Sequence, residues 1–277
     1  MADRPAPKAR RATKLVVRDT AWVTPHLIRT VSAPADPADF ERLRTPHTDA
    51  YVKVVFRPAG VSYPEPFDMA QVRQLPREQW PALRTYTLRE LRQDTGEIVI
   101  DFVYHGDAGL AGPWAAGLKP GDEMVVLGPG GAYHPDPSAD WHLFAGDESA
   151  LPAITAALAQ VPEGVPVYAF VEVADAGEEL PLDTPGALRP HWLHRGSGGN
   201  VVDAVRALDW PAGRVHAFVH GEAGQVKQLR RHLLAERGLS LEQLSISGYW
   251  RLGLDDESYR EAKQAERDAE EALTGVK

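Results

Sequence analysis

The pattern of apolar residues changes near residue 141, and this change constrains the fold more than any other feature of the sequence. Before it, short segments rich in Val, Ile, Tyr or Phe are separated by turns, as is typical of antiparallel β-strands. Five such segments are 15–18, 51–56, 85–89, 97–104 and 123–127. Pro113 precedes a short apolar run and predicts one short helix. The first half is therefore predicted to be a closed antiparallel β-barrel with one helix.

The second half alternates between strand-like and helix-like segments. Strands of the buried type are expected at 141–145, 165–173 and 214–219, and helices at 150–159, 200–208 and 225–237. Gly238 is placed to close the last of these helices. Strands that alternate with helices indicate a parallel sheet. The predicted fold class is thus a β-barrel followed by an α/β domain, with the boundary in the loop 133–140.

Both ends of the chain are predicted to lie outside these domains. Residues 1–14 are basic and are expected to form a flexible arm, because the apolar piece that follows is too short for a signal-peptide core. The barrel domain then spans 15–136 and the α/β domain 137–251. Residues 252–277 predict a C-terminal helix with opposite charges three or four residues apart. Its apolar stripe is mostly alanine, which favours a solvated helix over the alternative, a reversible lid.

Composition excludes several kinds of site. The 277 residues include no cysteine, which excludes disulfides, cysteine-ligated zinc, thiol nucleophiles and iron–sulfur clusters held by this chain. The formal net charge of −9 argues against a nucleic-acid partner. No apolar run approaches the ~20 residues of a membrane-spanning helix, so we expect a cytoplasmic protein without stable membrane insertion. The pairs His191/His194 and His216/His220 have no nearby acid in a ligand pattern, so no metal site is predicted.

One strand-like segment combines a cation, an aromatic ring and a hydroxyl. Alternation along a strand places Arg84, Tyr86 and Leu88 on one face. These groups suit a flavin dinucleotide, because Arg neutralises the pyrophosphate, Tyr packs on the flavin ring and the Thr87 hydroxyl can bond ring or ribitol atoms. Taken alone, a strand with Arg and Tyr is also ordinary protein surface.

A second segment, 101–114, reads DFVYHGDAGLAGPW. It predicts the end of a strand, a glycine-rich turn and the start of a helix. Free backbone N–H groups at a helix start suit a pyrophosphate. Two such segments close together in sequence are more specific for a dinucleotide than either one alone.

With stretches further along, these segments resemble the siderophore-interacting proteins, FAD-dependent ferric-siderophore reductases of the ferredoxin–NADP reductase superfamily. The matching stretches are YVKVVF, RTYTLR, DFVYHGDAG, WAAGLKPGD, GPGG, AGDESALPAI, HGEAGQVKQLRRHL and GYWR. The resemblance implies FAD contacts from Arg84, Tyr86, Thr87, Asp101, His105, Gly109, Ala111 and Trp114. At Gly112 and Pro113 the family often has a hydroxyl and a basic residue, so a phosphate cradle here must rely on backbone groups.

The stretch AGDESALPAI places Asp147, Glu148 and Ser149 between a strand and a helix. Ligands bind at the carboxyl ends of strands in open α/β sheets. Two acids would repel a phosphate there, so they suit helix capping or polar contacts with a nicotinamide amide. Gly221 and Glu222 end another strand and would line the same edge. The resemblance implies that these five residues bind NADH or NADPH, and four basic residues could hold its phosphates: Arg195, Lys227, Arg230 and Arg231.

The GPGG stretch at 128–131 looks like a phosphate loop, but no helix follows it, so a barrel turn is predicted. Related reductases often carry a basic residue beside this turn to meet an anionic iron chelate, where this chain has Gly130. The resemblance therefore assigns attraction of the substrate to Lys53, in YVKVVF, and Arg251, in GYWR.

The resemblance implies an enzyme in which FAD passes electrons from NAD(P)H, or from ferredoxin, to the Fe(III) of a siderophore and so releases Fe(II). No side chain need act as an acid or base, and no catalytic residue beyond the flavin is predicted. Two alternatives stay open: a non-catalytic siderophore-binding module, and a flavin reductase with a different electron acceptor.

Overall fold

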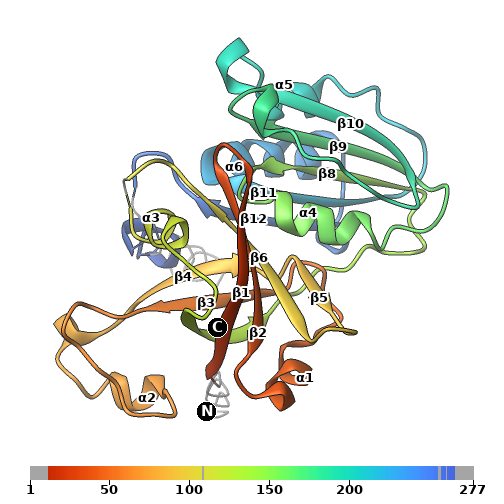
Figure 1. Ribbon diagram of the computed structural model, residues 1–277. Coiled ribbons are helices and arrows are strands. Elements are labelled where there is room, and N and C mark those ends of the chain that lie inside the picture. Colours follow the sequence, from red (N-terminus) through yellow and green to blue (C-terminus); the bar gives the residue numbers. More distant parts are fainter. Residues whose placement is uncertain (1–11, 108, 255–256, 260, 266–277) are drawn as a thin grey trace, which may run out of the picture. The chain divides into compact units, whose positions relative to one another are not determined.

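The computed structural model describes residues 12–107, 109–254, 257–259 and 261–265. The chain divides into two compact units, Met1–His134 and Pro135–Lys277. The first unit is built on an antiparallel, barrel-like sheet of seven strands, and the second on a parallel sheet of five with helices (Figure 1). The predicted fold class, a β unit followed by an α/β unit, is confirmed. No helix among the described residues is long and apolar enough to cross a membrane.

The seven strands of the first unit are ordered β4-β3-β7-β1-β2-β6-β5. Their bounds are β1 Ala12–Thr24, β2 Leu27–Pro34, β3 Tyr51–Phe56, β4 Ala82–Thr87, β5 Glu90–Arg92, β6 Glu97–Val103 and β7 Glu123–Gly130. Three short α-helices accompany them: α1 Phe40–Leu43, α2 Met69–Val72 and α3 Ala111–Ala116. Helix α3 is the one that the sequence predicted, and it begins two residues before Pro113.

The first strand starts earlier and runs further than predicted. Residues 12–14 pair with 125–127 of β7, so the predicted arm 1–14 is too long by three residues. Residues 1–11 lie outside the described part of the chain. Strand β2 was not predicted, because Arg29, Thr30 and Ser32 interrupt its apolar residues. Thr30 is nevertheless buried, and its hydroxyl donates a hydrogen bond to the Ile100 carbonyl at 3.2 Å.

Alternation explains how β3 packs. Val52, Val54 and Phe56 are buried, whereas Tyr51 and Lys53 are only half-buried. The buried side chains join a core with Ile98, Ile100 and Phe102 of β6. Burial of one such side chain stabilises the fold by about 1.5–3 kcal/mol. The core therefore fixes β3 and β6, on which the candidate cofactor residues depend.

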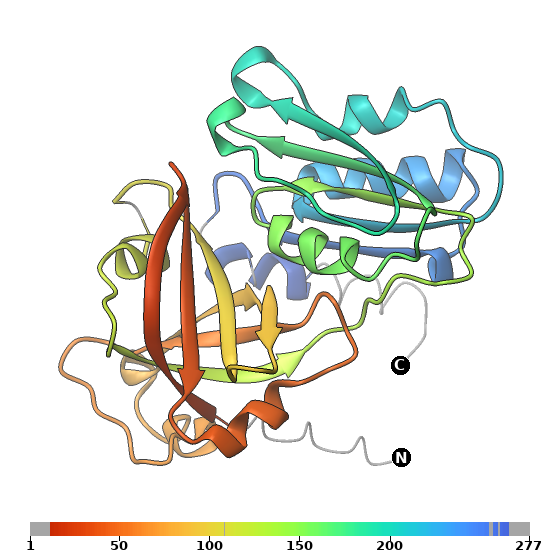
Figure 2. The same ribbon diagram turned by 45° about the vertical axis from the view of Figure 1, so that its right-hand side comes forward.

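The second unit has the strand order β10-β9-β8-β11-β12, all parallel. The strands are β8 Trp141–Asp147, β9 Pro166–Val173, β10 Ala187–His194, β11 Val215–Glu222 and β12 Leu244–Trp250. The helices are α4 Leu151–Leu158, α5 Val201–Arg206 and α6 Ala223–Arg231, and α6 continues as a π-helical turn over His232–Glu236. Helices α5 and α6 cover one face of the sheet and α4 the other (Figures 1 and 2).

Three histidines are buried on a single face of this sheet. His142 of β8 lies opposite His216 of β11 in register, and His220 follows two residues after Phe218. Burial lowers the pKa of His142 to about 4, and the charge of His216 adds to the effect. Burial, with Lys263 adding to it, lowers the pKa of His220 to about 3. The rings of His142 and His220 are therefore neutral members of the core.

Strands β10 and β12 were not predicted from the sequence. Both are sheet edges, so neither carries the continuous apolar run of a central strand. The connection from β9 to β10 also departs from the expected βαβ pattern. It contains only a 3-10 turn, Ala176–Glu178, and then an extended segment in place of an α-helix.

The described part of the C-terminal extension is helical over 257–259 and 261–265. Tyr259 is only 7% exposed, and Lys263 Nζ donates hydrogen bonds to Ser247 Oγ at 3.0 Å and to the Gly248 carbonyl at 2.7 Å. The expected solvated helix is thus wrong for this part, because these two side chains anchor it on β12. Residues 255–256, 260 and 266–277, including the predicted caps Asp255 and Asp256, lie outside the described residues.

Candidate functional site

An aromatic cluster in the first unit joins the two segments that the sequence singled out for FAD. The ring of Tyr86, on β4, lies 4.3 Å from that of Phe102, on β6, measured between centroids. Phe102 in turn lies 5.7 Å from Trp114 of α3, and Trp114 lies 5.0 Å from Phe56. Tyr86 and Trp114 are only half-buried at the margin of the core. The fold therefore brings Arg84, Tyr86 and the segment 101–114 together.

Asp101 lies at the centre of a buried ion cluster that sequence reasoning missed. It faces Arg29 in the β2–β6 ladder, and the two side chains form a bidentate pair with both N···O distances at 2.8 Å. Arg89 Nε lies 3.3 Å from the second carboxylate oxygen. Hydrogen bonding to Asp101 raises the pKa of Arg29. A FAD contact from Asp101 stays a prediction, and so does one from Thr87, which is buried.

A glycine turn connects β6 to α3. Gly106 and Gly109 have φ values of +74° and +86°, in the region that favours glycine. A Cβ built on either one would have no heavy atom within 4 Å, so both border open space. His105 and Gly109 lie on the exposed turn, whereas Ala111 is buried at the start of α3. A cation, a half-buried aromatic surface and an open glycine turn fit the requirements of FAD.

The GPGG stretch forms the end of strand β7, so the predicted barrel turn is wrong. The N–H groups that follow it, of Ala132 and Tyr133, both donate to Asp49 Oδ1 at 2.8 Å. A Cβ on Gly130 would lie 2.5 Å from the Tyr51 ring, so a larger residue here would require the Tyr51 ring to shift. Sequence alone missed this proximity because Tyr51 is distant along the chain.

Lys53 and Arg251, the predicted substrate residues, belong to different units. Lys53 pairs with Thr85 in the β3–β4 ladder, whereas Val52 and Val54 pair with Tyr86 and Arg84. Directly paired residues share a face, so Lys53 lies on the face opposite to Arg84 and Tyr86. Arg251 is exposed just after the end of β12.

In the second unit, Asp147 lies at the carboxyl edge of the parallel sheet, the edge formed by the C-terminal ends of its strands, and holds neighbouring segments together there. Its carboxylate is buried and accepts hydrogen bonds from the Ser149 N–H at 2.9 Å, the Glu222 N–H at 2.8 Å and Trp250 Nε1 at 2.8 Å. Burial, with a contribution from Glu148, raises its pKa to about 6. Gly221 is required here, since a Cβ would lie 2.6 Å from Asp147 Oδ2. The fold thus brings together Asp147, Ser149, Gly221 and Glu222.

Glu148 and Arg195 meet in an ion triad with Glu172. Arg195 donates to Glu172 Oε1 at 2.7 Å and to Glu148 Oε1 at 2.9 Å. Burial alone would lower the pKa of Arg195, but the two carboxylates outweigh it and raise the pKa above its usual value. No pattern in the sequence pointed to Glu172, which lies in the otherwise apolar strand β9.

Two of the helices that start at this edge, α5 and α6, are capped by side chains of the protein itself. Glu172 Oε2 accepts the N–H of Val201 at 3.0 Å at the start of α5, and Glu222 accepts that of Gln225 at 2.8 Å in α6. The basic residues Lys227, Arg230 and Arg231 lie on the exposed surface of α6 beyond its first turn. Glu172 and Glu222 thus act as helix caps. Asp147 and Glu148 do not, because α4 has no side-chain cap and Glu148 is paired with Arg195, and their contacts with a nicotinamide stay a prediction.

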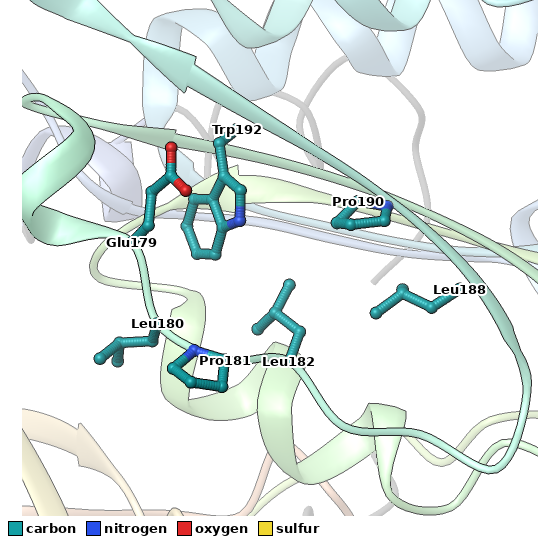
Figure 3. Close-up of a pocket in the computed structure, with 7 residues that line it drawn as sticks. All are labelled: Glu179, Leu180, Pro181, Leu182, Leu188, Pro190 and Trp192. Carbon is teal, nitrogen blue, oxygen red and sulfur yellow. The ribbon is translucent and has the colours of Figure 1, made fainter.

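A cavity of about 350 Å³ lies under the extended segment between β9 and β10 (Figure 3). Leu180, Pro181 and Leu182 of the segment face Pro190 and Trp192 of β10 across it. The missing crossover helix leaves this space. None of the predicted ligand residues lines it.

The histidine pairs have other partners. His216 Nδ1 accepts the Asp136 N–H at 2.9 Å, His194 Nε2 lies 2.7 Å from Glu179 Oε1, and His220 Nε2 lies 2.9 Å from Ser245 Oγ. The described residues contain no group of three or more His, Asp or Glu able to hold a metal ion.

Comparison with known families shows which family this chain belongs to. The siderophore-interacting FAD-binding domain matches residues 16–133, and the siderophore-interacting protein family matches residues 139–253. This chain belongs to the siderophore-interacting protein family. The family boundary falls in the same connection as the division between the two units.

Relatives of this siderophore-interacting protein cover most of its length. An uncharacterized protein of Mycobacterium tuberculosis is 40% identical over 91% of this chain and 94% of its own. The ferric vibriobactin reductase ViuB of Vibrio cholerae is 35% identical over 70% of this chain and 73% of its own. A siderophore utilization protein from T. fusca has 32% identity, covers 89% of this chain and 95% of its own, and has a TM-score of 0.75.

The expected superfamily fold is confirmed as well. A ferredoxin reductase of carbazole 1,9a-dioxygenase shares the two-unit fold with a TM-score of 0.61, covering 86% of this chain and 69% of its own. At 13% sequence identity, the likeness is one of fold alone.

Proposed function

We propose that this protein is a cytoplasmic ferric-siderophore reductase, in which bound FAD passes electrons from NAD(P)H or ferredoxin to a ferric siderophore. One observation carries the proposal: Tyr86 and Trp114 both pack against Phe102, so the strand with Arg84 lies beside the helix that follows the glycine turn. All of these residues lie in a part of the chain that matches the siderophore-interacting FAD-binding domain. The relative named as a ferric vibriobactin reductase supports this reaction over other flavin chemistry.

The side chains would bind and orient the cofactor. Arg84 would neutralise the pyrophosphate, and Tyr86 and Trp114 would pack against the flavin, while the backbone of the glycine turn approaches the phosphates closely. When bound, FAD accepts two electrons and releases them one at a time. The Asp101 cluster would hold β2 and β6 in place beneath this surface.

The carboxyl edge of the sheet in the second unit is the proposed binding site for the electron donor NADH or NADPH. Contacts of NADH or NADPH with Asp147, Glu148, Ser149, Gly221 and Glu222 remain part of the proposal. Arg195 is already paired with Glu148 and Glu172, however, so gripping a phosphate would require it to leave two carboxylates. Because Arg195 is already paired, a donor that needs no nucleotide phosphate site is the second candidate, and ferredoxin is such a donor.

Substrate attraction is proposed for Lys53 and Arg251. Ferric siderophores are often anionic, and a chain with a net charge of −9 repels anions at long range. Each of these basic side chains would offset that repulsion in its own surroundings; Lys53 would do so from the strand face opposite to Arg84 and Tyr86.

The decisive experiment is anaerobic reduction of the purified protein by NADH, NADPH or reduced ferredoxin, followed by addition of ferric siderophores. We expect loss of the 450 nm flavin absorbance with one donor, and its return as Fe(II) is captured by ferrozine. Flavin that is reduced but not reoxidised by ferric siderophores would indicate a different acceptor. A protein that binds ferric siderophore and holds no flavin would be the non-catalytic module.

A further inference from the structure

Trp22 is an exposed aromatic residue beside the glycine turn. It lies near the tip of the β1–β2 hairpin and is 51% exposed. A single exposed tryptophan needs no explanation by itself. Trp22 pairs with Ile28 of β2, and its ring contacts that of Tyr104, the first residue after β6.

Tyr104 holds the Trp22 ring in a fixed orientation. The two rings meet edge to face, with centroids 5.0 Å apart and an interplanar angle of 86°. The backbone N–H of Tyr104 donates to the His26 carbonyl at 2.8 Å, which ties the hairpin turn to the start of the loop. Trp22 is therefore pre-oriented while half of its surface stays open to a ligand.

The same tyrosine connects Trp22 to α3. A Cβ on Gly112 would lie 3.4 Å from Tyr104 Cδ2, so the tyrosine ring rests against the first turn of this helix. Trp114, two residues on, belongs to the cluster of Tyr86 and Phe102. Residues 105–107 and 109–114 are thus bordered by two aromatic groups, one containing Tyr86 and the other Trp22.

FAD has an aromatic group at each end, with the pyrophosphate between them. We infer that Trp22, oriented by Tyr104, is the stacking platform for the adenine ring of FAD, and that Asp107 accepts a hydrogen bond from the adenine amino group. Tyr104 Oη donates to Asp107 Oδ1 at 3.0 Å, which places this carboxylate beside the aromatic pair. The inference rests on the proposed use of FAD and deepens it, since FMN has no adenine to stack.

The test is flavin binding to the apoprotein of the full chain, for the wild type, Trp22→Ala, Trp22→Phe and Trp80→Ala. Trp80 is the matched control: it is 36% exposed in the same unit, lies outside the segment around Tyr104 and Asp107, and its Nε1 donates to the Leu75 carbonyl. We expect Trp22→Ala to weaken FAD binding about tenfold, or ~1.4 kcal/mol. Trp22→Phe should retain most of the affinity, and Trp80→Ala all of it.

Two further ligands separate the platform from a general loss of structure. FMN affinity should be equal in the wild type and Trp22→Ala, and AMP should quench tryptophan fluorescence in the wild type but not in Trp22→Ala. An equal loss of FAD and FMN affinity, unchanged FAD affinity, or no response to AMP would each overturn the adenine platform. Failure of the wild type to bind FAD at all would instead refute the proposed function.

Discussion

Around the turn 105–110 of the first unit, glycines with positive φ border open space, and aromatic side chains lie half-buried beside it. At the carboxyl edge of the second unit, by contrast, Asp147 and Glu172 already accept hydrogen bonds from their own chain, and Arg195 is ion-paired. Both regions contain the residue types of a nucleotide site. In the first region the described glycines border open space, whereas in the second the acidic side chains already have partners, so similar motifs differ in what they imply about binding.

The largest expected effect tests whether Asp147 is structural. Asp147→Ala would leave three donors without their acceptor at a buried position, so we expect the free energy of unfolding to fall by about 3–5 kcal/mol. Chemical denaturation followed by circular dichroism would measure it. Asp175→Ala removes an exposed cap of the Gly177 N–H and should cost at most about 1 kcal/mol. A stable Asp147→Ala protein that has lost only nucleotide affinity would show that Asp147 binds the ligand. The difference drawn between the two regions would then be wrong.

The next effect is the pH dependence of the second unit. In the unfolded chain His142 is protonated near its ordinary pKa of 6.5, whereas in the folded protein its pKa is lowered to about 4. Stability should therefore fall as pH drops from about 7 to 4, by up to ~1.4 kcal/mol per pH unit for this residue. His142→Phe should lose this part of the slope.

The difference between the wild type and His142→Phe isolates the histidine, because Asp147, with its raised pKa, acts in the opposite direction. Denaturant unfolding curves of both proteins at several pH values would measure this difference in the free energy of unfolding. Parallel pH profiles for the two proteins would show that His142 is not kept neutral by the fold.

In the first unit, Arg84→Ala should strip FAD while the protein stays folded. One charge-assisted hydrogen bond to the pyrophosphate contributes about 1.5–3 kcal/mol, so FAD affinity should fall roughly ten- to a hundredfold. Flavin content after purification and a titration of the apoprotein would measure it. A variant that purifies with full flavin content would remove Arg84 from the cofactor site.

The smallest expected effect concerns Lys53. Lys53→Glu should slow the reduction of anionic ferric siderophores several-fold and leave flavin content normal. The loss should shrink as salt rises, since a solvent-accessible charge is screened within about 8 Å at physiological ionic strength. Stopped-flow rates with an anionic and a neutral ferric chelate would compare the two. Equal losses for both chelates would make Lys53 a packing or flavin residue.

The two-part architecture and the central elements of each part could be predicted from local sequence patterns. Alternation along 51–56 and the apolar runs of β8, β9 and β11 reflect burial on one or both faces, which is a local property of the sequence. It also selected Arg84, Tyr86 and Trp114, which the fold brings together. The edge strands β10 and β12 were not predicted, because half-exposed strands have a weaker pattern of apolar residues.

Only the tertiary structure decided which polar side chains are available to a ligand. Asp101 is paired with Arg29, 72 residues earlier in the chain, and Asp147 with the backbone of Glu222, 75 residues later. Such pairings depend on strand register, and no local pattern encodes the distant partner. A buried carboxylate must find donors or become protonated, so these contacts fix its role more firmly than the motif in which it occurs.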